Sequence, residues 1–216
     1  MGEKYGGEVI PAQEFKHAMS FVNGFLEVEK NIQNKLITLD FILEVVKEDL
    51  KTDLLSYIFY SEANFSRQLI YPFPLRYSDR QGVSHSLKQK EAIDVDLARD
   101  CVLVLPWRRD RLCKQIINLF RNNFSYDSRN HKACYYPYVS LCYVYNGNHS
   151  IASGVVHKKG TIKAQQYDIT ELFPHIYTDG QSWYNTHTGE KTGDVTDFRI
   201  SIIYEVAKTK YQLDIS

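Results

Sequence analysis

The chain is 216 residues long, with 44% hydrophobic and 24% charged residues, which is the composition of a folded globular protein and not of a disordered one. Its 26 Lys and Arg residues equal its 26 Asp and Glu residues in number, so no overall positive charge would draw the protein to nucleic acid or to an anionic membrane. No window approaches the roughly 18 consecutive apolar residues of a membrane helix, and the N-terminus lacks a signal-peptide core. We therefore expect a soluble, cytoplasmic protein.

An amphipathic helical pattern runs through the N-terminal region. Apolar residues recur there at alternating spacings of three and four positions: Phe25, Val28, Ile32, Leu36, Leu39, Leu43, Val46 and Leu50. We predict one long helix along this stripe, packed on the protein's own core, with a coiled-coil seam as the alternative. Thr52 or Asp53 can cap a shorter helix that follows and carries Leu54, Leu55, Ile58 and Phe59.

The helical pattern stops at Tyr71-Pro72-Phe73-Pro74, because each proline lacks an amide donor and forces its predecessor into extended geometry. The polar stretch at 78–90 then predicts an exposed loop. We therefore divide the chain into a helical N-terminal region (1–77), a linker or loop (78–99) and a mixed α/β region (100–216).

The C-terminal region alternates between β-rich and helical segments. Its composition and spacing predict strands at 101–105, 138–145, 161–169 and 181–185, and helices at 109–121, 151–157 and 196–210. The strand at 138–145 is apolar on both sides and is expected in the interior of a sheet. The fold class expected for the whole chain is α+β, with the helical N-terminal region packed on a small mixed sheet.

A strand, a glycine and a helix follow one another directly around Gly147. Glycine permits a sharp bend and close approach of a ligand to the backbone. The first helical amides, near His149 and Ser150, would then point outward at the positive end of the helix dipole, an arrangement that suits a phosphate. His149 could donate a hydrogen bond to a phosphate oxygen.

The run from Gly147 to Ala152 resembles the Gly-x-His-Arg-x-x-Ala signature of the ParB/sulfiredoxin-like superfamily, which is also seen in "DGQHR"-type proteins. The order of the surrounding segments is similar too. A strand, a proline and arginines precede a helix at 102–111, and a strand follows the motif at 160–164. The resemblance covers about residues 100–170 and implies a ParB/sulfiredoxin-like domain.

In that superfamily the motif helix and an arginine of the first segment hold nucleotide phosphates. The resemblance therefore implies that phosphate is held by Gly147, Asn148, His149 and Ser150 and neutralised by one of Arg108, Arg109 and Arg111. ATP or CTP would be the nucleotide, with Mg²⁺ as an accompanying ion, and His149 would be the catalytic candidate. Ser150 replaces the arginine of the signature and brings no charge, which weakens the expected stabilisation of a transition state.

The leading hypothesis is a nucleotide- or phosphate-binding protein of bacterial or phage type, with weak nucleotide hydrolysis or phosphotransfer as its activity if it has one. The first alternative is a non-catalytic phage or mobile-element factor that binds a host protein through a tyrosine-rich sheet or the long helix. The second is a DNA-binding or nuclease module that uses the basic patch at 107–121. The histidine spacing does not favour a metal site, and reduced, packed thiols are expected at Cys101, Cys113, Cys134 and Cys142.

Overall fold

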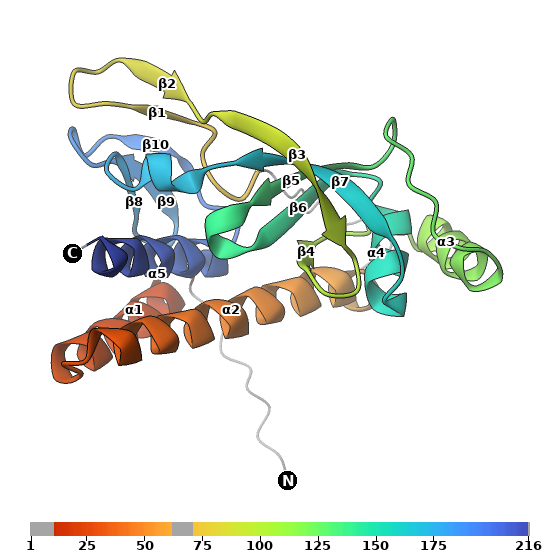
Figure 1. The fold of residues 1–216 in the computed structure, drawn as a ribbon, viewed down its shortest axis with the longest axis horizontal. Helices are drawn as coiled ribbons and strands as arrows, with labels where there is room; N and C mark the ends of the chain where they lie inside the picture. Colours follow the sequence, from red (N-terminus) through yellow and green to blue (C-terminus); the bar gives the residue numbers. More distant parts are fainter. Residues whose placement is uncertain (1–10, 62–70, 216) are drawn as a thin grey trace, which may run out of the picture.

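The computed structural model describes residues 11–61 and 71–215 and has the α+β fold class expected from the sequence (Figure 1). Within these residues there are five α-helices: α1 (Pro11–Val28), α2 (Ile32–Tyr60), α3 (Arg109–Arg121), α4 (Asn148–His157) and α5 (Phe198–Asp214). None of the helices in the described ranges is long and apolar enough to cross a membrane. The N-terminal residues on which the signal-peptide expectation rests lie outside the described part.

The central sheet has five strands in the order β3-β7-β5-β6-β4. These strands are β3 (Gln89–Asp96), β4 (Cys101–Leu103), β5 (Lys132–Tyr136), β6 (Leu141–Asn146) and β7 (Thr161–Tyr167). The sheet is mixed, because β7 and β5 are parallel, as are β6 and β4, whereas the other neighbours are antiparallel. The strand predicted at 138–145 corresponds to β6, which has a neighbour on each side and so lies in the interior of the sheet, as predicted.

Two smaller sheets complete the fold. One is the hairpin of β1 (Arg76–Ser78) and β2 (Ser84–Ser86), and the other is formed by β8 (Ile176–Thr178), β9 (Ser182–Asn185) and β10 (Lys191–Asp194). Short 3₁₀ helices occur at Pro137–Val139 and Ile169–Leu172.

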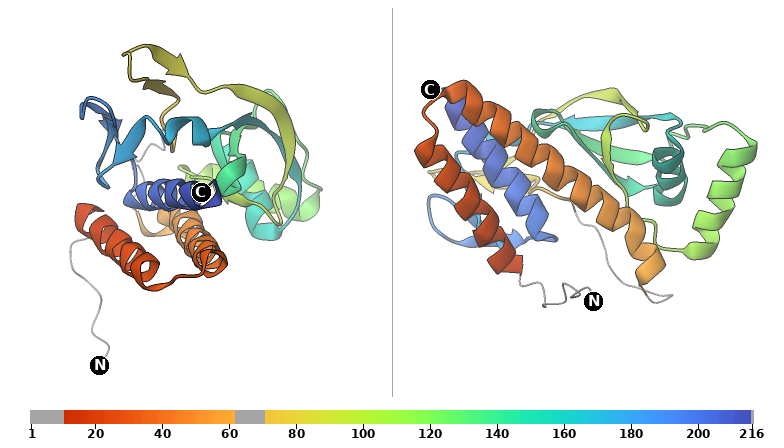
Figure 2. Two further views of the ribbon diagram at one scale, coloured as in Figure 1. Left: turned by 60° about the vertical axis from the view of Figure 1, so that its left-hand side comes forward. Right: turned by 90° about the horizontal axis from the view of Figure 1, so that it is seen from below.

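Side chains of the central sheet alternate between two hydrophobic cores, as the period of a strand requires. On β6, Leu141 and Tyr143 belong to a core shared with α1, α2 and α5, whereas Cys142 and Val144 belong to a core shared with α4. Figure 1 shows α1, α2 and α5 below the sheet, and Figure 2 shows α5 between α1 and α2. The sheet is therefore covered by a three-helix layer on one face and by α4 on the other.

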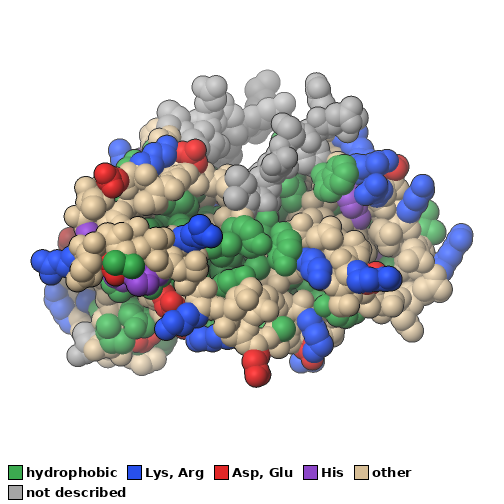
Figure 3. Space-filling view, turned by 90° about the horizontal axis from the view of Figure 1, so that it is seen from above, with side chains coloured by type: hydrophobic (Ala, Val, Ile, Leu, Met, Phe, Trp, Pro, Cys, Tyr) green, Lys and Arg blue, Asp and Glu red, His purple; other side chains and the backbone are tan. Residues whose placement is uncertain are grey.

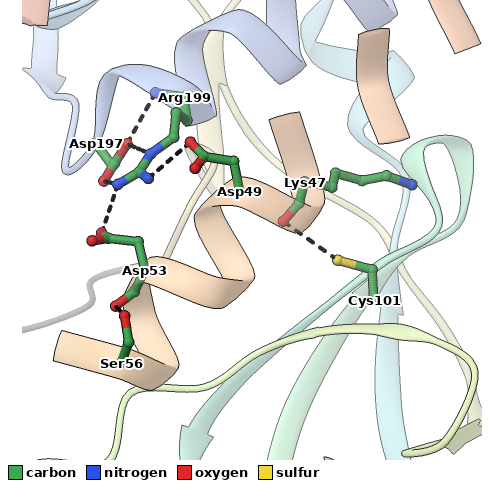
Figure 4. Close-up of polar contacts among 7 residues, drawn as sticks. All are labelled: Lys47, Asp49, Asp53, Ser56, Cys101, Asp197 and Arg199. Carbon is green, nitrogen blue, oxygen red and sulfur yellow. Dashed lines mark hydrogen bonds and ion pairs between the residues drawn. The ribbon is translucent and has the colours of Figure 1, made fainter. Parts of the chain in front are cut away.

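Polar contacts tie the helical layer together and join it to the sheet (Figure 4). At the start of α5, Arg199 forms ion pairs with Asp49 and Asp53 of α2, at 3.1 and 2.7 Å, and with Asp197, at 2.8 Å. The thiol of Cys101 on β4 donates to the carbonyl oxygen of Lys47 on α2 at 3.9 Å. These contacts hold α2 in register with both α5 and β4.

The N-terminal helices differ from the prediction. The apolar stripe at 25–50 is divided between α1 and α2, because the helix ends at Val28 and Asn31 caps a new one by accepting from the Asn34 N–H at 3.2 Å. The predicted start of a shorter helix at Thr52 or Asp53 is wrong, since α2 continues without a break to Tyr60. Local capping residues favour a boundary, but buried positions through Leu50, Leu54 and Ile58 keep the helix packed on the core.

The predicted loop at 78–99 is also wrong in its secondary structure. It contains most of the β1–β2 hairpin and the whole of β3, an edge strand of the central sheet. The segment is mostly exposed, as expected, but Ile93, Val95 and Leu97 face the core under α4. β5 was not predicted, and Cys113 is exposed, whereas the other three cysteines are buried as expected.

Candidate functional site

The strand–glycine–helix arrangement around Gly147 is present as predicted. β6 ends at Asn146, Gly147 adopts the left-handed conformation with φ +82°, and α4 begins at Asn148. The first hydrogen bond within the helix runs from the Ile151 N–H to the Gly147 carbonyl oxygen at 3.1 Å. The N–H groups of the preceding residues of α4 therefore have no carbonyl partner in the helix.

An open cavity of about 400 Å³ lies in front of this helix start. It is lined by residues 145–150, by Trp107 and Asn130, and by the α3 residues Arg111, Lys114 and Gln115. Its lining contains no Asp or Glu. Arg111 and Lys114 lie three positions apart on α3 and so share one face of the helix.

Arg111 and Lys114 keep their charges available. In the described part of the chain neither side chain forms an ion pair, and Arg111 lies over the ring of Trp107, with its guanidinium carbon 5.5 Å from the ring centroid. A cation–π contact leaves the guanidinium hydrogens free to donate in the plane of the group. The cavity is thus positive, with helix amides on one side and a guanidinium and an ammonium on the other.

The first side chains of α4 hold the segment that leads into α3. The Asn148 side-chain oxygen accepts from the Leu105 N–H at 3.0 Å, and His149 Nε2 accepts from the Arg108 N–H at 3.0 Å. These bonds bring together two segments about forty residues apart, the same two that the family resemblance places in one site. They also show that both side chains are used to build the site.

The surroundings of His149 favour one neutral tautomer. Burial lowers the pKa of His149, and the charge of Arg111 lowers it further. Because Nε2 accepts a hydrogen bond, the neutral ring carries its proton on Nδ1. Trp107 packs edge-on against the ring, with the centroids 5.4 Å apart. His149 can therefore donate one hydrogen bond to an anion.

Behind the helix start, a chain of hydrogen bonds fixes Gly147. The Asp127 N–H donates to His131 Nδ1 at 3.1 Å, His131 Nε2 then donates to Ser150 Oγ at 2.8 Å, and Ser150 Oγ donates to the Gly147 carbonyl oxygen at 3.0 Å. Although His131 lies in a loop, where a histidine is usually solvated, only 4% of it is exposed. No local sequence signal marks its role, which depends on the loop at 122–131 returning to α4.

Gly147 is enclosed on one side and open to the cavity on the other. A Cβ at this position would lie 2.6 Å from His131 Cδ2 and 3.1 Å from the Asn130 carbonyl oxygen. Gly147 nevertheless lines the cavity. The packing of His131 against the bend therefore supports the site without filling it.

The three predicted arginines have different positions. Arg111 lines the cavity, whereas Arg108 is paired with Asp110 at 2.8 Å on the surface. Arg109 points away from the cavity and donates to the carbonyl oxygens of Ile58 and Ser61 at the end of α2. The cavity-lining Lys114, which sequence reasoning placed only in the basic patch at 107–121, takes the second cationic position.

The surface features expected for the alternative functions are only partly present. Lys and Arg side chains are prominent at the end of the molecule that carries α3 (right in Figure 3), but Arg109 is engaged with α2 and Arg108 with Asp110. Of the tyrosines on the sheet, Tyr136 and Tyr143 are buried in the core. On the outward side of α2, Ile37, Phe41 and Val45 are 58%, 67% and 52% exposed. Partner binding through α2 stays a prediction.

The chain matches one protein family, and the function of that family is unknown. A family described as "Family of unknown function (DUF6710)" matches residues 3–216, nearly the whole chain, and the chain therefore belongs to this family. No curated protein matches the chain, and no solved structure matches it. Within the described residues, no group of three or more His, Cys, Asp or Glu side chains is placed to hold a metal ion.

Proposed function

We propose that this member of DUF6710 binds the phosphate group of an anionic small molecule in the cavity between α3 and the start of α4. One observation carries the proposal: the cavity has two cationic side chains without ion-pair partners in the described structure, and no carboxylate in its lining. Surface cations are usually solvated or paired with acids, whereas a cavity with cations alone attracts an anion.

The remaining donors of the cavity support phosphate as that anion. The N–H groups at the start of α4 can donate hydrogen bonds to an anion. The positive end of the helix dipole also favours a negative charge at this position. A neutral His149 adds an Nδ1–H donor, and the planar guanidinium of Arg111 can bind two oxygens at once. Several donors around one cavity match the several acceptor oxygens of a phosphate.

The same geometry favours binding over turnover. His149 Nε2 already accepts the Arg108 N–H, and Ser150 Oγ is engaged with His131 and with Gly147. The cavity lining also offers Mg²⁺ no carboxylate, the ligand that the ion prefers in proteins. We therefore assign Mg²⁺ only the role of an ion that accompanies the phosphates, and His149 the role of a binding residue.

Calorimetric titration with sodium tripolyphosphate tests the proposal. Wild type is expected to bind, and Arg111→Gln and Lys114→Gln are each expected to weaken binding about tenfold, because each removes a charge-assisted hydrogen bond of roughly 1.5 kcal/mol. Arg99→Gln is the matched control, since Arg99 is exposed on the turn between β3 and β4 and does not line the cavity.

Arg109→Gln serves as a second control with a distinct outcome. It removes the same charge from the same helix, but its contacts are with the end of α2, so it should lower the free energy of unfolding by about 1 kcal/mol and leave tripolyphosphate affinity unchanged. Absence of binding to wild type, or equal losses in the Arg111, Arg99 and Arg109 variants, would contradict the proposed site.

A further inference from the structure

A cavity of about 260 Å³ lies between the last turns of α2, α3 and the second half of α4. On α3, Leu112 and Ile116 line this cavity, whereas Arg111 and Gln115 line the cavity proposed for phosphate, so the two cavities lie against different faces of the helix. The other lining residues are Thr52, Leu55, Ser56 and Phe59 of α2, Pro106, and Ala152, Ser153, Val156 and His157 of α4. We call this space the α2–α3–α4 cavity.

The α2–α3–α4 cavity offers a ligand very little polar surface. Among the described residues that line it there is no Lys, Arg, Asp or Glu. The hydroxyl groups of Ser56 and Ser153 donate to backbone carbonyl oxygens of their own helices, those of Asp53 at 3.3 Å and His149 at 3.0 Å. A charged ligand would lose its hydration in this cavity without gaining a partner of opposite charge. The lining therefore favours an uncharged, mainly apolar ligand.

Apolar side chains at the cavity remain exposed to solvent. Phe59 and Val156, which line it, are 66% and 64% exposed. A bound apolar molecule would remove part of this surface from water, which is favourable. The ring of Phe59 also gives an aromatic ligand a partner for stacked or edge-on contact.

The volume of the cavity suits one ring with small substituents. An apolar protein cavity of about 150 Å³ already holds benzene. The α2–α3–α4 cavity is larger, at about 260 Å³, but lies below the roughly 300–1,000 Å³ of sites for drug-sized ligands. A single substituted ring therefore fits better than a long or branched molecule.

His157 supplies a hydrogen-bond acceptor at this apolar site. Its Nδ1 lies 3.0 Å from the Ser153 carbonyl oxygen, which can only accept, so Nδ1 carries a proton. In the neutral ring Nε2 is then an acceptor, and it has no partner within the described ranges of the chain. The half-buried imidazole lines the cavity, so a ligand hydroxyl can donate to Nε2.

We propose that the α2–α3–α4 cavity binds a small, uncharged aromatic compound with one hydroxyl group, of which a phenol is the simplest example. The aromatic ring occupies the apolar space between the three helices, and the hydroxyl donates to His157 Nε2. This site is separate from the proposed phosphate site, because the two cavities share no lining residue.

The experiment compares three ring compounds of similar shape by ligand-observed NMR titration, at mildly alkaline pH, where histidine is ordinarily neutral. Wild type is expected to bind p-cresol saturably. The ether 4-methylanisole has no hydroxyl donor and should bind about fivefold more weakly, the effect of one neutral hydrogen bond. The anion 4-methylbenzoate should bind at least about tenfold more weakly, because its charge finds no partner in the cavity.

His157→Phe tests the hydrogen bond and keeps an aromatic ring at the position. We expect a loss of about fivefold in affinity for p-cresol and no change for 4-methylanisole. His17→Phe, at an exposed position of α1, is the matched control and should bind both compounds as wild type does.

Thr52→Trp tests the location of the site. Thr52 is exposed on α2 and lines the cavity, so an indole at this position should fill the space and abolish p-cresol binding. Gln33→Trp, at an exposed position of the same helix away from the cavity, should leave p-cresol binding unchanged. Circular dichroism verifies that both variants are folded, and both should bind tripolyphosphate as wild type does.

The outcomes that overturn the proposal are specific. Wild type that does not bind p-cresol, or a folded Thr52→Trp variant that binds it as wild type does, would overturn the site. Equal affinity of wild type for p-cresol and 4-methylanisole would overturn the ligand class, because the hydroxyl would then contribute nothing. A second copy of the chain is the competing occupant, and self-association in analytical ultracentrifugation that Thr52→Trp abolishes and p-cresol does not affect would also overturn the proposal.

Discussion

At the scale of single residues, Gly147 has two separate reasons to be glycine. Its φ of +82° lies in the left-handed region, where a side chain costs about 1–2 kcal/mol. Its absent Cβ also leaves the space that His131 occupies, at 2.6 Å from the ideal Cβ position. The left-handed conformation concerns the bend alone, whereas the close approach of His131 couples the bend to the loop at 122–131.

Substitution by alanine separates these two reasons. Gly82 has a similar φ of +79°, but nothing lies within 4 Å of its ideal Cβ position. Gly82→Ala should therefore lower the free energy of unfolding by about 1 kcal/mol, and Gly147→Ala by clearly more, because His131 must also shift. Urea denaturation of both variants measures the difference. Equal losses would show that the His131 packing contributes nothing.

At the scale of elements, His131 joins the loop after α3 to the start of α4. Its Nδ1 accepts from the Asp127 N–H, and its Nε2 donates to Ser150, so both ring nitrogens are committed in the neutral form. Protonation would place a second donor opposite the Asp127 N–H. Burial lowers the pKa of His131 from its usual 6.5, in agreement with this geometry.

The lowered pKa predicts how stability depends on pH. Well above pH 6.5 both the folded and the unfolded chain hold His131 neutral, and its contribution is constant. As the pH falls below 6.5, the unfolded chain binds a proton that the folded chain refuses, so the free energy of unfolding decreases. His131→Gln should reduce this dependence in urea denaturation between pH 7.5 and 5. The pH dependence that remains in this variant includes the contribution of His149, whose pKa is lowered as well. If the free energy of unfolding depended on pH as strongly in the variant as in wild type, the tautomer assigned to His131 would be contradicted.

The elements also show what local sequence can predict. The bounds of α3 agree with the predicted helix at 109–121, because the apolar spacing and the placement of Asp110 in the first turn and Arg121 in the last turn all lie within the segment. β5 escaped prediction because it is only five residues long and its place in the sheet depends partly on pairing with β7, about thirty residues further along the chain. β3 escaped for a related reason: it is an edge strand, and most of its residues are exposed and polar.

In the candidate site, too, the features set by local sequence could be predicted, and those set by tertiary structure could not. Gly147 and the start of α4 were predictable from a strand, a glycine and a helix in succession. The position of Arg109 was not, because it depends on where the end of α2 lies across the fold. Likewise, His131 lies in a loop with no local pattern, and only the tertiary structure brings it beside Ser150.

At the scale of the whole molecule, the N-terminal helices and the C-terminal region share one hydrophobic core. Phe15 and Val22 of α1, Leu43 of α2 and Trp183 of β9 are all buried in it, and α5, at the other end of the chain, packs between α1 and α2 (Figure 2). The ion pairs of Arg199 cross the same boundary. The predicted division at 78–99 therefore does not separate two cores.

A shared core predicts a single cooperative unfolding transition. Trp107 and Trp183 are the two tryptophans of the chain, so Trp107→Phe leaves a fluorescence signal from the buried Trp183 alone. In urea, this signal and the circular dichroism of the helices at 222 nm should have the same midpoint. Arg199→Gln should lower both midpoints together, at a cost of about 2 kcal/mol, because it removes the ion pairs between α5 and α2. A helical transition that precedes the Trp183 transition would instead show that the N-terminal helices fold as a separate unit.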